Sequence, residues 1–197
     1  GGVLEGLMLL KKRGHLVKIA SGINLKQVIQ KSGLEFIDLG LPLIRTRRNN
    51  ESIDSLINDH LSINFFNVEN ILRGYENLSK EISKNGVNII ISDAYCRVAD
   101  LATKQHDIPL IVIAPDPKST SRQLYDLFLS YLVNCSQRIE DKIGVSLSFS
   151  QEYPLIYESS LLNVHFSTPL FHNERQNKSH FFVGGDVPLH ICIQELA

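Results

Sequence analysis

The residues best suited to chemistry in this 197-residue chain lie where short apolar segments end. Asp93 follows the apolar segment 87–92, and Pro115 and Asp116 follow a second such segment, 110–114. A carboxylate in such a place can orient a histidine and stabilise its charged form, which makes the histidine a stronger base. Asp93 can equally cap the helix expected after it, because aspartate suits that position. On sequence alone both interpretations of Asp93 stay open.

The remaining titratable residues do not indicate a metal site or a disulfide framework. The seven histidines have no spacing typical of a metal site, so we expect solvated or core roles for them. Cys96, Cys135 and Cys192 are too few and too scattered for a disulfide framework or a zinc site. We therefore expect no metal and no bound cofactor, and a reducing, cytoplasmic location.

Several well-known motifs are absent. The sequence contains neither the Gly-x-Gly-x-x-Gly fingerprint of dinucleotide binding nor a phosphate-binding Gly-x4-Gly-Lys-Ser/Thr loop. It also lacks a Gly-x-Ser-x-Gly elbow and a His-Glu-x-x-His pair. Nucleophilic hydrolysis and metalloprotease chemistry are therefore not expected.

The composition is that of a folded protein, with 43% hydrophobic and 21% charged residues. Twenty basic residues against 21 acidic ones give no positive field for phosphates, so we expect no nucleic-acid partner. No apolar run approaches the roughly 20 residues of a membrane span, so no transmembrane segment is expected.

Helical and strand patterns alternate along the chain. Three consecutive isoleucines, Ile89 to Ile91, predict a strand buried on both faces, as in a parallel sheet. Asn24 is the expected cap of the second helix, and a long loop is expected at 41–61. We expect strands at 16–20, 34–39, 87–92, 110–114, 161–166 and 180–183, and helices at 3–13, 25–31, 63–84, 97–106 and about 121–142.

This alternation predicts an α/β fold, an open doubly wound parallel (Rossmann-like) sheet with helices on both faces. Ligands of such sheets bind beyond the carboxyl ends of the strands. The residues expected to line that edge include Asp93, Tyr95, Pro115, Asp116 and Ser119.

Four segments, in this order, resemble the N-terminal half of a GT-B glycosyltransferase, of the family-one type that includes UDP-glycosyltransferases and macrolide glycosyltransferases. The first contains Arg13-Gly14-His15 ahead of a strand, and the third is a strand that ends in Asp93. The last, His180-Phe-Phe-Val-Gly-Gly185, is similar to the "valine-glycine-proline" close of that domain, with Gly185 in place of the usual proline. The segments are 9–22, 32–40, 87–114 and 180–185.

The resemblance implies that residues 1–186 form the acceptor-binding domain and that 187–197 begin a linker or tail. It implies a sugar transfer, with inversion, from a nucleotide-sugar co-substrate, such as a UDP-sugar, to the hydroxyl of a small-molecule or lipid acceptor. Asp93 would support a catalytic histidine, and Tyr95, Pro115, Asp116 and Ser119 would contact the acceptor. The donor would be bound by a C-terminal GT-B half, in cis or in trans.

Counting back from Gly14 and His15, the resemblance also implies that the family's first strand and its catalytic histidine would precede Gly1. The 197 residues alone are therefore expected to be inactive. One alternative is a non-catalytic α/β binding subunit that partners a separate nucleotide-sugar-binding chain. Another is an epimerase of GT-B shape, which we rank lower because Asp93 and the Arg-Gly-His segment suit transfer better.

Overall fold

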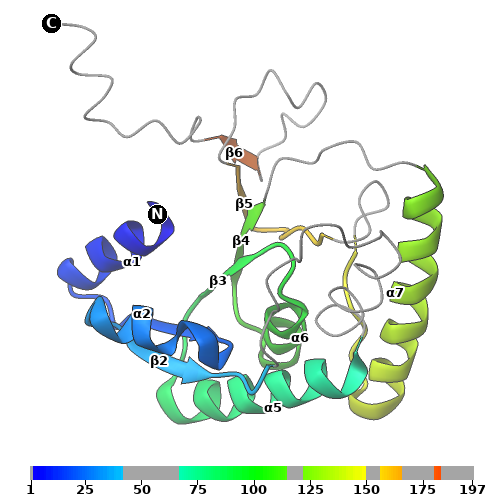
Figure 1. Cartoon of the computed structure of the whole chain (residues 1–197), viewed down its shortest axis with the longest axis horizontal. Coiled ribbons are helices and arrows are strands. Elements are labelled where there is room, and N and C mark those ends of the chain that lie inside the picture. Colours follow the sequence, from blue (N-terminus) through cyan, green and yellow to red (C-terminus); the bar gives the residue numbers. More distant parts are fainter. Residues whose placement is uncertain (1, 42–66, 115–121, 150–155, 166–179, 183–197) are drawn as a thin grey trace, which may run out of the picture.

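A computed structural model describes residues 2–41, 67–114, 122–149, 156–165 and 180–182 (Figure 1). Every strand pair in these ranges is parallel, and helices lie on either side of the strands. The predicted α/β class, with parallel strands and flanking helices, is therefore confirmed. The predictions for the loop at 41–61 and for the start of the helix at about 121 fall almost wholly outside the described residues.

The first part of the chain contains two helices and two strands. Helix α1 (Gly2–Lys12) leads to β1 (Lys18–Ser21), and α2 (Lys26–Lys31) leads to β2 (Glu35–Asp38). The two strands pair in parallel, with Lys18 opposite Glu35 and Ser21 opposite Asp38.

The predicted cap of α2 is wrong. Asn24 lies inside a short 3-10 helix, η1 (Ile23–Leu25), which runs directly into α2. Leu25 takes the cap position, and no side chain accepts a hydrogen bond there. The preceding helical turn thus takes the place of the capping side chain that the sequence suggested.

Helix α5 (Val68–Asn85) connects the two parts of the chain. The Asn67 side chain caps its start by accepting a hydrogen bond from the Asn70 amide at 2.9 Å. Gly86 follows its last residue in the left-handed conformation, with φ 61°, so the helix ends one residue beyond the predicted end at 84. Residues 63–66, also predicted to be helical, lie outside the described ranges.

The second part of the chain alternates regularly. It comprises β3 (Ile90–Asp93), α6 (Arg97–His106), β4 (Leu110–Ala114), α7 (Arg122–Ile143), β5 (Leu162–His165) and β6 (His180–Phe182). The four strands lie side by side in the order in which they occur along the chain. The predictions for α6 and β4 are correct at both ends.

The core lies between α5, α6, α7 and the strands. Ile71, Leu101 and Ile139 are at most 1% exposed in one cluster, while Leu78 and Val98 belong to a second. Helices α5 and α6 approach so closely that a Cβ on Gly74 would lie 2.7 Å from Cγ2 of Val98. The interface between α5 and α6 is therefore tightly packed.

Within the described residues, the strands form two separate parallel groups, β1–β2 and β3–β4–β5–β6, where the sequence predicted one sheet. Strand β3 is thus an edge strand there, with β4 as its partner. Ile91 is 40% exposed and Ile89, just before the strand, is 44% exposed. The prediction that this segment is buried on both faces is wrong, because Ile89 and Ile91 share one face of the strand and that face is incompletely covered.

Candidate functional site

The turn after β3 has Asp93 as its first residue. Its side chain is exposed, and Oδ1 accepts a hydrogen bond from the Tyr95 amide at 2.8 Å. Cys96, not Asp93, is the cap residue of α6, and no side chain accepts a capping hydrogen bond there. The alternative in which Asp93 caps this helix is therefore wrong, and its carboxylate closes a tight turn instead.

Tyr95 shares this turn and is 38% exposed. Partial burial, helped by the negative charge of Asp93, raises the pKa of its phenol above the ordinary value. The hydroxyl therefore remains protonated at neutral pH and can donate a hydrogen bond. Of the predicted site residues, the structure brings Asp93 and Tyr95 together, while Pro115, Asp116 and Ser119 lie outside the described residues.

Pairing with β4 fixes the place of this turn. Asp93 lies opposite Ile113, and the Ala94 amide donates to the Ile113 carbonyl at 3.1 Å. Ala114, the last residue of β4, lies opposite His165 of β5. The carboxyl ends of β3, β4 and β5 thus meet at one edge, and the segment after Ala114 begins next to the Asp93 turn. His165 is fully buried, in agreement with a core role.

Sequence reasoning missed Tyr157, which contacts the turn from a distant part of the chain. Its side chain is fully buried, and burial raises the pKa of its phenol. The hydroxyl lies 3.0 Å from Oγ of Ser92, 3.2 Å from the Asp93 carbonyl oxygen and 3.1 Å from that of Cys96. No local sequence signal could have found this contact, because it joins residues more than 60 positions apart.

Cys96 has a half-buried thiol in the same turn. Burial, together with the charge of Asp93, raises the pKa of this thiol to about 11. The thiol form, and not the nucleophilic thiolate, therefore dominates at neutral pH. Cys96 does not supply a nucleophile to the site.

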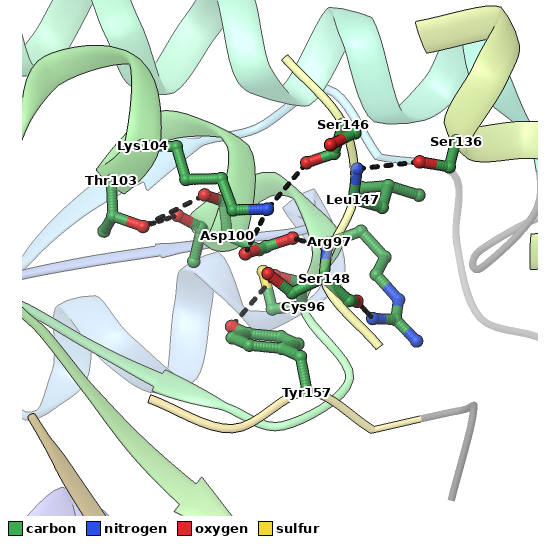
Figure 2. Close-up of polar contacts among 11 residues, drawn as sticks. Cys96, Arg97, Asp100, Thr103, Lys104, Ser136, Ser146, Leu147, Ser148 and Tyr157 are labelled. Atoms are coloured by element: carbon green, nitrogen blue, oxygen red, sulfur yellow. Dashed lines mark hydrogen bonds and ion pairs between the residues drawn. The ribbon is translucent and has the colours of Figure 1, made fainter. Parts of the chain in front are cut away.

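Three residues of α6 hold the segment after α7 (Figure 2). Nη1 of Arg97 donates to the Ser148 carbonyl at 2.6 Å, and Oδ2 of Asp100 accepts from the Ser148 amide at 2.6 Å. Lys104 donates to the Ser146 carbonyl at 2.6 Å. Burial lowers the pKa of Arg97, with the charge of Asp100 opposing that effect.

The Arg97 guanidinium also lies 5.7 Å from the centre of the Tyr157 ring, so this polar cluster adjoins the Asp93 turn. Its members bond to the backbone of Ser146 and Ser148, so the cluster ties α6 to the segment after α7.

A cleft of about 710 Å³ lies between the start of α5 and the middle of α7. Its lining mixes polar and apolar groups, and none of it comes from the Asp93 turn. The lining residues are Asn67, Val68, Glu69, Ser130, Tyr131, Asn134, Cys135 and Arg138.

Among the described residues, no group of three or more His, Cys, Asp or Glu side chains is placed to hold a metal ion. None of the described helices is both long and apolar enough to cross a membrane.

Comparison with solved structures supports the class of fold. The chain is similar to the glycotransferase of kitacinnamycin, with 13% identity and a TM-score of 0.64 over 94% of this chain and 48% of that one. It is also similar to SsfS6, a glycosyltransferase from Streptomyces sp. SF2575, with 13% identity and a TM-score of 0.54 over 85% of this chain and 47% of that one. The same enzyme in complex with thymidine diphosphate gives a TM-score of 0.52 at 13% identity, over 91% of this chain and 47% of that one.

The chain therefore has a glycosyltransferase-like fold and spans about half the length of these enzymes. No protein-family model and no curated protein matches the sequence.

Proposed function

We propose that this chain is the acceptor-binding half of a nucleotide-sugar-dependent glycosyltransferase, a hexosyltransferase that acts with inversion. The single observation that carries the proposal is the exposed Asp93 carboxylate at the carboxyl edge of the parallel strands, in a glycosyltransferase-like fold. In such a sheet this edge is where ligands bind.

The proposed reaction has one displacement step. A histidine outside these 197 residues removes the proton from the acceptor hydroxyl, and the Asp93 carboxylate stabilises the imidazolium that forms. The acceptor oxygen attacks the anomeric carbon of the sugar, and the bond from that carbon to the leaving phosphate oxygen breaks. The nucleoside diphosphate leaves with the electron pair, and attack from the opposite face inverts the anomeric configuration.

We propose that Tyr95 contacts the acceptor through its neutral phenol and its exposed ring, and that Pro115, Asp116 and Ser119 do so from the segment after β4. The acceptor is a small molecule or a lipid. The donor binds to a C-terminal GT-B half, in cis or in trans. The similar enzymes support this part of the proposal, because this chain matches only about half of each of them.

We also propose that a further parallel strand pairs between β1 and β3 to complete the sheet of the domain at 1–186. Within the described residues, each of these strands has a neighbour on one side. Ala20 of β1 and Ile90 of β3 pack against the same buried cluster. A strand ahead of α1 would reach β1 by the usual right-handed crossover, and it would give the edge of β3 a partner.

The test is a product analysis with the native polypeptide that contains these residues. It is incubated with UDP- and TDP-sugars and a panel of hydroxyl acceptors, and we expect acceptor-dependent release of nucleoside diphosphate and a product of inverted anomeric configuration. Epimerisation of the sugar without transfer would favour the epimerase and overturn the proposal. Absence of any turnover, together with capture of a separate nucleotide-sugar-binding chain, would favour the non-catalytic subunit.

A further inference from the structure

We propose that Tyr157 is a positioning residue whose buried hydroxyl fixes the turn after β3 and thereby the direction of the Asp93 carboxylate. The importance of this direction for catalysis rests on the proposed function. The contacts between Tyr157 and the turn do not depend on that function. The proposal stands on contacts from both the side chain and the backbone of Tyr157.

The hydroxyl lies between the two ends of the turn. It is 3.2 Å from the carbonyl oxygen of Asp93 and 3.1 Å from that of Cys96, and Figure 2 shows the contact to Cys96. The Tyr157 amide also donates to the Ala94 carbonyl, at 3.2 Å. One residue thus contacts three positions of the turn. The protonated phenol has one hydrogen, which the two carbonyl oxygens and Oγ of Ser92 share as acceptors.

The segment that carries Tyr157 is itself held in place. Oγ of Ser159 donates to the Leu110 carbonyl at 2.5 Å, which ties the segment to the start of β4. The Asn163 side chain accepts from the Ser159 amide at 2.8 Å and donates to its carbonyl at 2.7 Å, which ties the segment to β5. Tyr157 therefore links the frame of β4 and β5 to the Asp93 turn.

The backbone of the turn determines where the carboxylate points, because Oδ1 of Asp93 accepts the Tyr95 amide at 2.8 Å. If the turn loosens, this amide moves and the Asp93 side chain can rotate to other positions. Among the described residues, no second hydrogen bond or ion pair holds the exposed carboxylate, so its direction depends on this one amide.

The variant Tyr157→Phe removes the hydroxyl and keeps the ring. We expect it to fold, because the Asp93 carbonyl still accepts from the Cys96 amide at 3.3 Å and the Cys96 carbonyl from the Ala99 amide at 3.0 Å. In the isotope-labelled native polypeptide, NMR should show the Tyr95 amide exchanging with water roughly tenfold faster than in the wild type. The NMR scalar couplings that report χ1 of Asp93 should change from values typical of one rotamer to an average over several rotamers.

Ser159→Ala is the matched control. It removes the bond to β4, but the two bonds from Asn163 to the Ser159 backbone still hold the segment, and the Tyr157 hydroxyl keeps its partners. Tyr95 exchange should therefore stay within about twofold of the wild type. The Gly40 amide, which donates to Asp38 at 2.8 Å in the turn after β2, serves as an internal control and should not change.

Two results would overturn the proposal: Tyr95 exchange within about twofold of the wild type in Tyr157→Phe, or an equal rise in Ser159→Ala. Neither measurement requires turnover, so failure of the proposed transferase activity would leave this test intact. Conversely, an active transferase with an unchanged Tyr95 amide in Tyr157→Phe would reject only the positioning role.

Discussion

The turns after β2 and β3 are built alike but are supported differently. In each, an exposed aspartate is the last residue of a strand and accepts the amide two residues on, at 2.8 Å: Gly40 for Asp38 and Tyr95 for Asp93. After β2 the turn continues through Gly40 in the left-handed conformation, with φ 65°. After β3 the turn is contacted at both ends by Tyr157, a distant and fully buried tyrosine.

This difference shows how a local motif becomes a candidate site. The aspartate and its following amide are enough to form the turn in both places, because aspartate readily accepts hydrogen bonds from its own neighbouring backbone. Among the described residues, an exposed contact reaches the turn after β2, where Nη1 of Arg73 donates to the Gly40 carbonyl at 3.5 Å. The turn after β3 is instead contacted at both ends by Tyr157, a fully buried side chain. The burial of this long-range support, and not the aspartate itself, distinguishes Asp93 from Asp38.

The largest expected effect is on stability, from Tyr157→Ala. Removal of a fully buried ring should lower the free energy of unfolding by about 3–5 kcal/mol. Tyr95→Ala, at a position 38% exposed in the same turn, is the comparison and should cost less than about 1.5 kcal/mol. Chemical denaturation measures both values. Equal losses in the two variants would show that Tyr157 is no special support of the turn.

The turn after β2 should be sensitive at its glycine instead. A Cβ on Gly40 would stand in the left-handed region and 3.1 Å from Cδ of Arg73, so Gly40→Ala should cost about 1–2 kcal/mol. Gly33 has a similar φ, 77°, but a Cβ added there would have no atom within 4 Å. Gly33→Ala therefore measures the backbone strain alone. In thermal unfolding, the melting temperature of Gly40→Ala should be equal to or lower than that of Gly33→Ala. The reverse order would mean that contact with Arg73 does not constrain this turn.

The smallest effect is the pH dependence of the Tyr157 hydroxyl. At neutral pH, Tyr157→Phe should lower the free energy of unfolding by about 0.5–1.5 kcal/mol. Burial raises the folded pKa above the ordinary 10.0, so above pH 10 the unfolded wild type loses its proton while the folded protein keeps it. The advantage of tyrosine over phenylalanine is thus full below pH 10 and shrinks above it.

Urea unfolding of both proteins at about pH 8 and about pH 11 measures this change. A stability difference that stays constant between the two conditions would contradict a buried, protonated phenol at the turn.

The elements defined by local pattern were predictable from the sequence. Helix α6 begins and ends at the predicted residues, and α5 ends one residue beyond the predicted 84, where Gly86 adopts a positive φ. The parallel pairing of β3 with β4 also follows from their apolar composition and the helix between them. Asp93 and Tyr95, which were predicted to line the same edge, share one turn because they are only two residues apart.

Features that depend on distant contacts were not predictable. Tyr157 contacts Cys96 across 61 positions, and no periodicity marks such a pair. Ile91 is 40% exposed because its face of β3 is incompletely covered, and a run of isoleucines cannot reveal how neighbouring elements cover a face. The preceding 3-10 turn displaced Asn24 from the cap of α2, because a backbone alternative competes with the side chain.

The central claim is that Asp93, and not its structural counterpart Asp38, serves sugar transfer. The most direct measurement compares Asp93→Asn with Asp38→Asn in the native polypeptide, since asparagine keeps an oxygen for the amide of either turn and removes the charge. We expect Asp93→Asn to lower kcat by about 10²–10⁴-fold and Asp38→Asn to leave it within about threefold of the wild type. Equal activity of the two variants, or a larger loss in Asp38→Asn, would contradict the account.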